Sequence, residues 1–140
     1  MAEFDLERFV IAQEDVYADA LAELEAGRKQ SHWMWFVFPQ LAGLGRSPTA
    51  TFFGIGSAAE ARAYLAHPLL GPRFHACAEA LLAHRGRSAE AILGPIDAMK
   101  LRSSMTLFEA VAADPAPFAS VLEAFFDGGR DPVTLDLLRG

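Results

Sequence analysis

The feature that most constrains the fold of this chain is a series of helix start and stop signals from Ser57 onward. Ser57 and Glu60 form a capping-box pattern, in which a hydroxyl and a carboxylate satisfy the first free amides of a helix. Proline stands at several later starts, where its missing amide proton is not needed. The expected helices cover residues 57–67, 68–84, 88–93, 98–113 with Asp97 as cap, 116–127, and 132 onward.

The chain before Ser57 is harder to assign. Apolar residues at three- and four-residue spacing predict a helix over residues 5–27, with a break allowed at residues 14–15 and Gly27 at its end. Residues 33–38 (WMWFVF) are either a short buried strand or a buried helical turn, and residues 49–55 (TATFFGI) predict a strand. The expected fold is mainly α, a single compact domain over residues 1–140 with about six helices and at most two short strands.

Composition excludes several function classes. Twelve Lys and Arg against eighteen Asp and Glu give a net charge of −6, which argues against general nucleic-acid binding. A single cysteine excludes an internal disulfide, and the four histidines lack metal-ligand spacing. The longest apolar run is far below the roughly 20 residues of a membrane span, and residues 1–4 lack signal-peptide features. We therefore expect a cytoplasmic protein without metal, cofactor or membrane association.

The first candidate binding region is the basic and aromatic segment 28–40. Its two cations suit a phosphate or carboxylate, and a tryptophan ring can stack on a base. The structural alternative places the aromatic rings in the core and the cations at a solvated helix end. The candidate ligand-binding residues are Arg28, Lys29, His32, Trp33, Trp35 and Gln40.

Two further regions carry polar donors. The loop over residues 40–47 (QLAGLGRS) could cradle an anion with its amides and with Ser47, although it matches no phosphate-loop motif and an ordinary turn is the alternative. In the segment 97–106 (DAMKLRSSMT), a helix would place Lys100, Ser103 and Ser104 on one face. That face favours anion binding, and a packed core helix is the alternative.

Three carboxylates are candidates for a catalytic role. Cleavage of a glycosidic bond needs a carboxylate that stabilises an oxocarbenium-like charge. Glu60, Asp97 and Asp131 could each supply it, and the sequence does not choose among them.

Four long segments resemble a known family. They are residues 28–40 (RKQSHWMWFVFPQ), 63–71 (AYLAHPLLG), 100–108 (KLRSSMTLF) and 125–135 (FFDGGRDPVTL). On these segments the chain is identified as a member of the bacterial domain-of-unknown-function 1810 family, with Phe53 where the family pattern has Tyr. The resemblance implies a mainly helical, intracellular and functionally uncharacterised protein.

Two functional associations come with this resemblance. Members often carry the label calpastatin, a eukaryotic protease inhibitor, but a short motif in a disordered chain has nothing in common with this compact composition. The order of motifs is also similar to that of small domains that handle NAD and ADP-ribose, which resemble the glycosidases associated with riboflavin biosynthesis. This second similarity is an analogy of pattern order.

The sequence therefore supports two hypotheses. In the first, the protein binds a small anionic, ring-containing ligand of the NAD and ADP-ribose class and cleaves an N-glycosidic bond. In the second, it is a non-enzymatic interaction domain, a homodimer or an adaptor, that uses its aromatic residues, which are 11% of the chain. The first hypothesis requires residues 28–40 and 97–106 to line one concave pocket.

Overall fold

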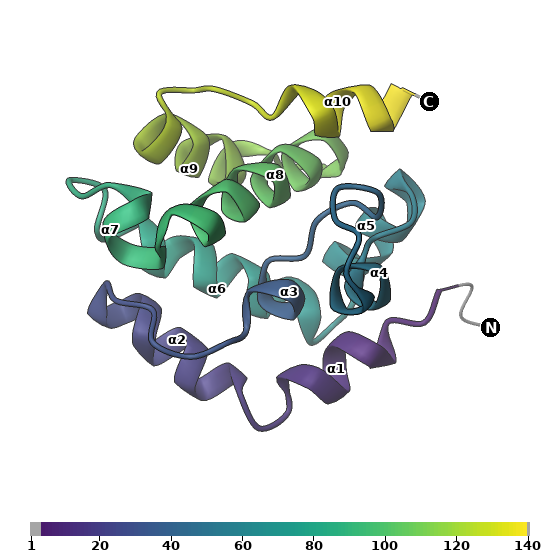
Figure 1. The fold of residues 1–140 in the computed structure, drawn as a ribbon, viewed down its shortest axis with the longest axis horizontal. Coiled ribbons are helices and arrows are strands. Elements are labelled where there is room, and N and C mark those ends of the chain that lie inside the picture. The colour runs from purple at the N-terminus through teal and green to yellow at the C-terminus, as the bar shows by residue number, and fades with distance from the viewer. Residues whose placement is uncertain (1–3, 140) are drawn as a thin grey trace.

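A computed structural model describes residues 4–139 as a mainly helical fold (Figure 1). The helices of this part of the chain are α1 (Glu7–Gln13), α2 (Tyr17–Ala26), α3 (Met34–Val37), α4 (Pro48–Phe53), α5 (Ala58–Ala66), α6 (Leu70–Leu82), α7 (Ala89–Leu93), α8 (Pro95–Val111), α9 (Ala116–Phe126) and α10 (Pro132–Arg139). None of them, within residues 4–139, combines the length and apolarity that crossing a bilayer requires. The signal-peptide prediction rests mostly on residues 1–3, which lie outside the described residues.

The expectation of about six helices was wrong, because residues 4–139 form ten. The predicted helix over residues 5–27 is interrupted after Gln13, at the acidic pair, and resumes at Tyr17. It ends as predicted at Gly27, whose φ of 72° is the left-handed conformation that favours glycine. Residues 33–38 contain the helical turn α3 rather than a strand.

The strand predicted over residues 49–55 was also wrong. The Ser47 hydroxyl accepts a hydrogen bond from the Ala50 amide at 3.1 Å, and Pro48 occupies the first turn, so this segment begins as the helix α4. Local capping outweighs the β-propensity of the threonine and phenylalanine residues. In residues 4–139 the remaining β-type pairing is one isolated parallel bridge between Leu41 and Ile55.

Most later helices begin close to their start signals, although the helix predicted from Pro68 begins at Leu70, and α8 differs in a more informative way. Ser57 and Ser88 cap α5 and α7 by accepting from Glu60 and Ala91 amides, each at 3.1 Å. The helix expected from residue 98 begins instead at Pro95, because proline is favoured in a first turn. Asp97 therefore lies inside the first turn of α8, and its carboxylate is free to contact other segments.

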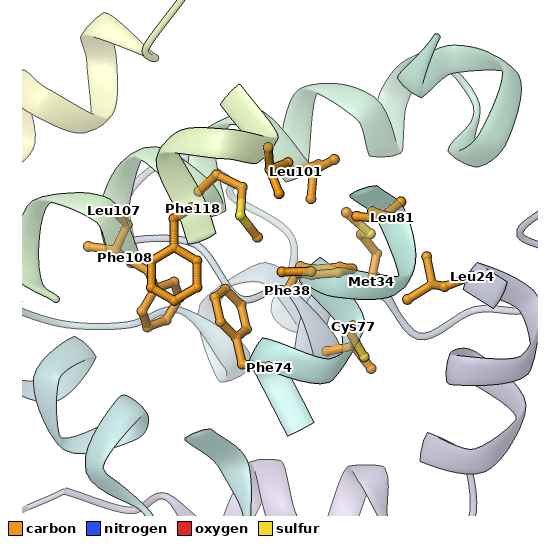
Figure 2. Close-up of a cluster of buried hydrophobic side chains, with 14 of the residues drawn as sticks. Leu24, Met34, Phe38, Phe74, Cys77, Leu81, Leu101, Leu107, Phe108 and Phe118 are labelled. Atoms are coloured by element: carbon orange, nitrogen blue, oxygen red, sulfur yellow. The ribbon is translucent and has the colours of Figure 1, made fainter. Parts of the chain in front are cut away.

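The core is organised around Phe74 on α6, which Figure 2 shows among side chains from several helices. Its ring centroid lies 4.5 Å from that of Phe108, 5.3 Å from Phe118, 5.6 Å from Phe38 and 6.0 Å from Tyr64. These contacts join α6 to α5, α8, α9 and the residue that follows α3. The core cluster includes Phe38 of the candidate segment 28–40 and Leu101 and Met105 of the segment 97–106, so it holds both segments in one packed unit.

We predict that Phe74→Ala destabilises the protein by about 3–5 kcal/mol, because it removes the ring that these four aromatic side chains share. Ile11→Ala is the control, since Ile11 is 64% exposed and its loss should change the free energy of unfolding by at most about 0.5 kcal/mol. Urea unfolding followed by circular dichroism measures both. A loss below about 1 kcal/mol for Phe74→Ala would contradict the central position of this ring.

Candidate functional site

A cleft of about 380 Å³ lies where the chain after α3, the first half of α8 and the start of α10 meet. We call it the α8 cleft. Its lining combines four polar or charged side chains with mostly apolar neighbours. The lining residues are Trp35, Gln40, Leu44, Gly45, Ile96, Met99, Lys100, Ser103, Asp131 and Val133.

Five of the residues singled out in the sequence line this cleft: Trp35, Gln40, Lys100, Ser103 and Asp131. The apolar half of the lining was missed. Ile96 and Met99 are 71% and 72% exposed, which is unusual for side chains of this size on a helix that packs into the core. Their position outside the core depends on how α8 is rotated against its neighbours, and the apolar pattern of α8 alone does not reveal it.

Three charged side chains connect the segment after α2 to α8. The Asp97 carboxylate forms ion pairs with Lys29 Nζ at 2.8 Å and with Lys100 Nζ at 3.2 Å. Each ammonium group also lies over an indole, Lys29 at 5.1 Å from the Trp33 ring centroid and Lys100 at 4.0 Å from that of Trp35. Two lysines share one carboxylate, so the cluster carries one surplus positive charge.

Asp97 is ionised in this setting. Burial opposes its charge, but hydrogen bonds from Lys29 and Lys100 outweigh burial and hold the pKa of Asp97 below its ordinary value of 3.8. The Lys29 side chain is only 9% exposed and that of Lys100 19%, so the ion pairs are shielded from water. The carboxylate therefore keeps both lysines at the site.

Among residues 4–139, Asp131 is the one carboxylate that lines the α8 cleft. Its Oδ2 accepts hydrogen bonds from the Ser103 and Thr134 hydroxyls at 2.8 and 2.6 Å, and its Oδ1 accepts from the Val133 amide at 3.3 Å. Burial raises the pKa of Asp131, but these hydrogen bonds outweigh it and the pKa lies below the ordinary 3.8. The group is an oriented anion at neutral pH.

The other predicted residues lie outside the cleft. Trp33 is 1% exposed and belongs to the core, and Ser104 is fully buried, with a hydroxyl that has no hydrogen-bond partner among residues 4–139. Glu60 accepts from the Gly56 amide at 2.7 Å and pairs with Arg8 at 2.9 Å, which gives it a structural role. Arg28 and Ser47 are exposed, and Lys29 and His32 line a second hollow beside the cleft.

The family model described as "Protein of unknown function (DUF1810)" matches residues 3–138. The chain belongs to this family. It is also similar to a solved structure, that of the conserved hypothetical protein Rv1873 from Mycobacterium tuberculosis, with 52% identity and a TM-score of 0.97 over 99% of each chain. No curated protein matches the chain.

Glu23, which the sequence analysis did not identify, holds the start of the segment 28–40 in place. Its carboxylate accepts from the Gln30 and Ser31 amides at 2.7 and 3.0 Å, from the Ser31 hydroxyl at 2.6 Å and from Trp33 Nε1 at 2.9 Å. Burial opposes its charge, but these bonds, led by that of Ser31, lower the pKa of Glu23 from 4.5 to about 2. Glu23 is seven to ten residues from its partners, and no local motif links them.

We predict that Glu23→Gln destabilises the protein at neutral pH and removes part of its acid sensitivity. A pKa below the unfolded value means that Glu23 stabilises the fold above about pH 4.5, and that this contribution is lost as the pH falls toward 2. Unfolding curves near neutral pH and near about pH 3 should therefore show a gap between wild type and variant that narrows in acid.

Glu25→Gln on the same helix is the control, because Glu25 is exposed and none of these donors binds its carboxylate. With Glu25→Gln, the free energy of unfolding should fall toward low pH as it does in wild type. An equal gap between wild type and Glu23→Gln at both pH values would show that the hydrogen bonds to Glu23 do not depend on its charge.

Proposed function

We propose that this domain binds a small nucleotide-like ligand, of the NAD and ADP-ribose class, in the α8 cleft. The observation that carries the proposal is the meeting of residues 28–40 and 97–106 at one cleft: Trp35 and Gln40 from the first segment face Met99, Lys100 and Ser103 from the second. The surplus positive charge shared by Lys29, Asp97 and Lys100 suits an anionic group such as a phosphate.

The base of such a ligand would be held mainly by aliphatic side chains. The Lys100 ammonium group already covers the Trp35 ring at 4.0 Å, so simple stacking on that indole face would require Lys100 to move. Ile96 and Met99 on α8, together with Leu44 and Val133 from the other segments, offer apolar surface to a planar ring. Covering Ile96 and Met99 would also remove exposed apolar area from water, which favours binding.

We predict that Lys100→Met weakens binding of AMP and ADP-ribose by about 10- to 100-fold, because a charge-assisted hydrogen bond to the ligand contributes roughly 1.5–3 kcal/mol. Titration calorimetry measures the affinity, and circular dichroism checks that the variant folds. Arg62→Met is the charge-matched control, since Arg62 lines a different hollow with Val111 and Asp114. Failure of wild-type protein to bind any such ligand at millimolar concentration would refute the proposal.

We propose cleavage of an N-glycosidic bond as the reaction of this cleft. Of the three candidate carboxylates, Glu60 is paired with Arg8, and Asp97 is paired with two lysines. Asp131 lines the cleft as an anion oriented by two hydroxyls, the property needed to stabilise an oxocarbenium-like sugar. In this hydrolysis the C1′–N bond breaks with its electron pair going to the base, and water adds its oxygen to C1′. The proton that water loses goes to solvent when neutral nicotinamide leaves from NAD, and to the base nitrogen when the base would otherwise leave as an anion.

We predict that wild-type protein releases free base from NAD or from an ADP-ribosylated base, and that Asp131→Asn lowers the rate by about 100-fold or more. Chromatography of the products measures release. Asp136→Asn is the control, because Asp136 lies on α10, the helix that follows Asp131, and is three-quarters exposed in its pair with Arg139. Ligand binding by wild type without any release of base would limit the function to binding.

The alternative of a homodimer or adaptor keeps little aromatic surface, because the one large aromatic side chain exposed among residues 4–139 is Phe52, at 57%. Trp33 is buried, and Trp35 is partly buried beneath Lys100. The exposed apolar side chains nearest the α8 cleft are Ile96, Met99 and Val133, and these are the ones the proposed ligand would cover. We therefore favour ligand binding over an interaction domain.

A further inference from the structure

The hollow beside the α8 cleft has the features of a second subsite. It has a volume of about 350 Å³ and lies at the junction of α7 and α8, next to the segment that precedes α3. We call it the His32 hollow. It is lined by Lys29, His32, Leu93, Gly94, Pro95, Ile96 and Asp97.

The two spaces adjoin. Ile96 lines both of them, and Asp97 of the His32 hollow is bonded to Lys100 of the α8 cleft. The Asp97 carboxylate also binds Lys29. The ammonium groups of Lys29 and Lys100 therefore lie on the two oxygens of one carboxylate, at 2.8 and 3.2 Å. A chain of linked anionic groups could reach from one lysine to the other.

The polar groups of the His32 hollow suit an anionic or hydroxyl-rich ligand part. His32 is exposed, and within residues 4–139 its ring has no hydrogen-bond or ion-pair partner. It is therefore available as a donor. Lys29 lines the same hollow and is paired with Asp97. Each space is at the lower end of the roughly 300–1,000 Å³ typical of ligand pockets, and the two together give room for a ligand larger than a mononucleotide.

We infer that the ligand has two parts, with its ring in the α8 cleft and a second phosphate- or sugar-bearing part in the His32 hollow. This inference rests on the proposed function and makes it more specific. A mononucleotide would occupy the cleft alone, whereas a nucleoside diphosphate extended by a further sugar would occupy both spaces. His32 and Lys29 then determine specificity for ligand length.

Affinities for AMP, ADP, ADP-ribose and NAD, measured by titration calorimetry, test this inference. Wild-type protein should bind ADP-ribose or NAD at least about 10-fold more tightly than AMP, since one additional charge-assisted contact contributes that much. His32→Ala should remove most of this difference and leave AMP affinity unchanged. Arg28→Ala is the matched control, because Arg28 is an exposed cation four residues away that lines neither space.

Lys29→Met provides a second measurement and should also reduce the preference for the longer ligands. Because Lys29→Met breaks the pair with Asp97, its folding is checked by circular dichroism. If it does not fold, His32→Ala is the deciding variant. Equal affinities for AMP and ADP-ribose, or a His32→Ala loss that is the same for both, would overturn the two-part inference and leave the proposed function standing. Absence of binding to all four ligands would overturn the proposed function itself.

Discussion

The candidate site depends on one shared carboxylate. Asp97 holds Lys29 and Lys100 together, and thereby joins the segment before α3 to the first turns of α8. The two lysine ammonium groups repel each other, and the Asp97 carboxylate that both bind offsets this repulsion. The partial burial of all three groups strengthens both ion pairs. Each lysine then faces an indole, so the same carboxylate sets the positions of the charge and of the aromatic surface. Lys100 of this cluster lines the α8 cleft, and Lys29 and Asp97 line the His32 hollow.

The helix α8 connects this cluster to the other wall of the cleft. Arg102 donates to the Gly129 and Arg130 carbonyls at 2.7 and 2.6 Å, and Thr106 Oγ1 accepts from the Asp131 amide at 3.0 Å. These bonds fix the loop that carries Asp131 before α10 begins, and Ser103 then orients its carboxylate. Successive turns of α8 therefore supply the Lys100 cation, the Ser103 hydroxyl and the Thr106 hydroxyl that binds the Asp131 amide. Asp131 is the only carboxylate among residues 4–139 that lines the cleft. Such rigid positioning is what binding and catalysis by a small site require.

Helix starts were predictable where they depend on neighbouring residues. Ser57, Ser88 and Pro132 mark them correctly, because a capping hydroxyl or a proline acts within one turn. The segment 49–55 was misassigned because its β-branched and aromatic residues are a weaker determinant than the Ser47 cap that precedes them. Ser103 and Ser104 were expected on one face, yet Ser103 lines the cleft and Ser104 is buried, because consecutive helical residues point about 100° apart. Glu23 escaped prediction because its partners are brought to it by a loop with no local motif.

The sequence by itself determined the helical class of the protein, most helix boundaries after Ser57 and the residue types available for chemistry, because these follow from interactions within a few positions of the chain. Only the tertiary structure decided which of them meet. It placed Trp33 in the core and Trp35 at the cleft, paired Glu60 with Arg8, and left Asp131 facing the cleft. Those outcomes depend on how segments that are distant in the sequence pack against one another. Packing optimises the whole buried surface at once, so no single stretch of residues carries that information.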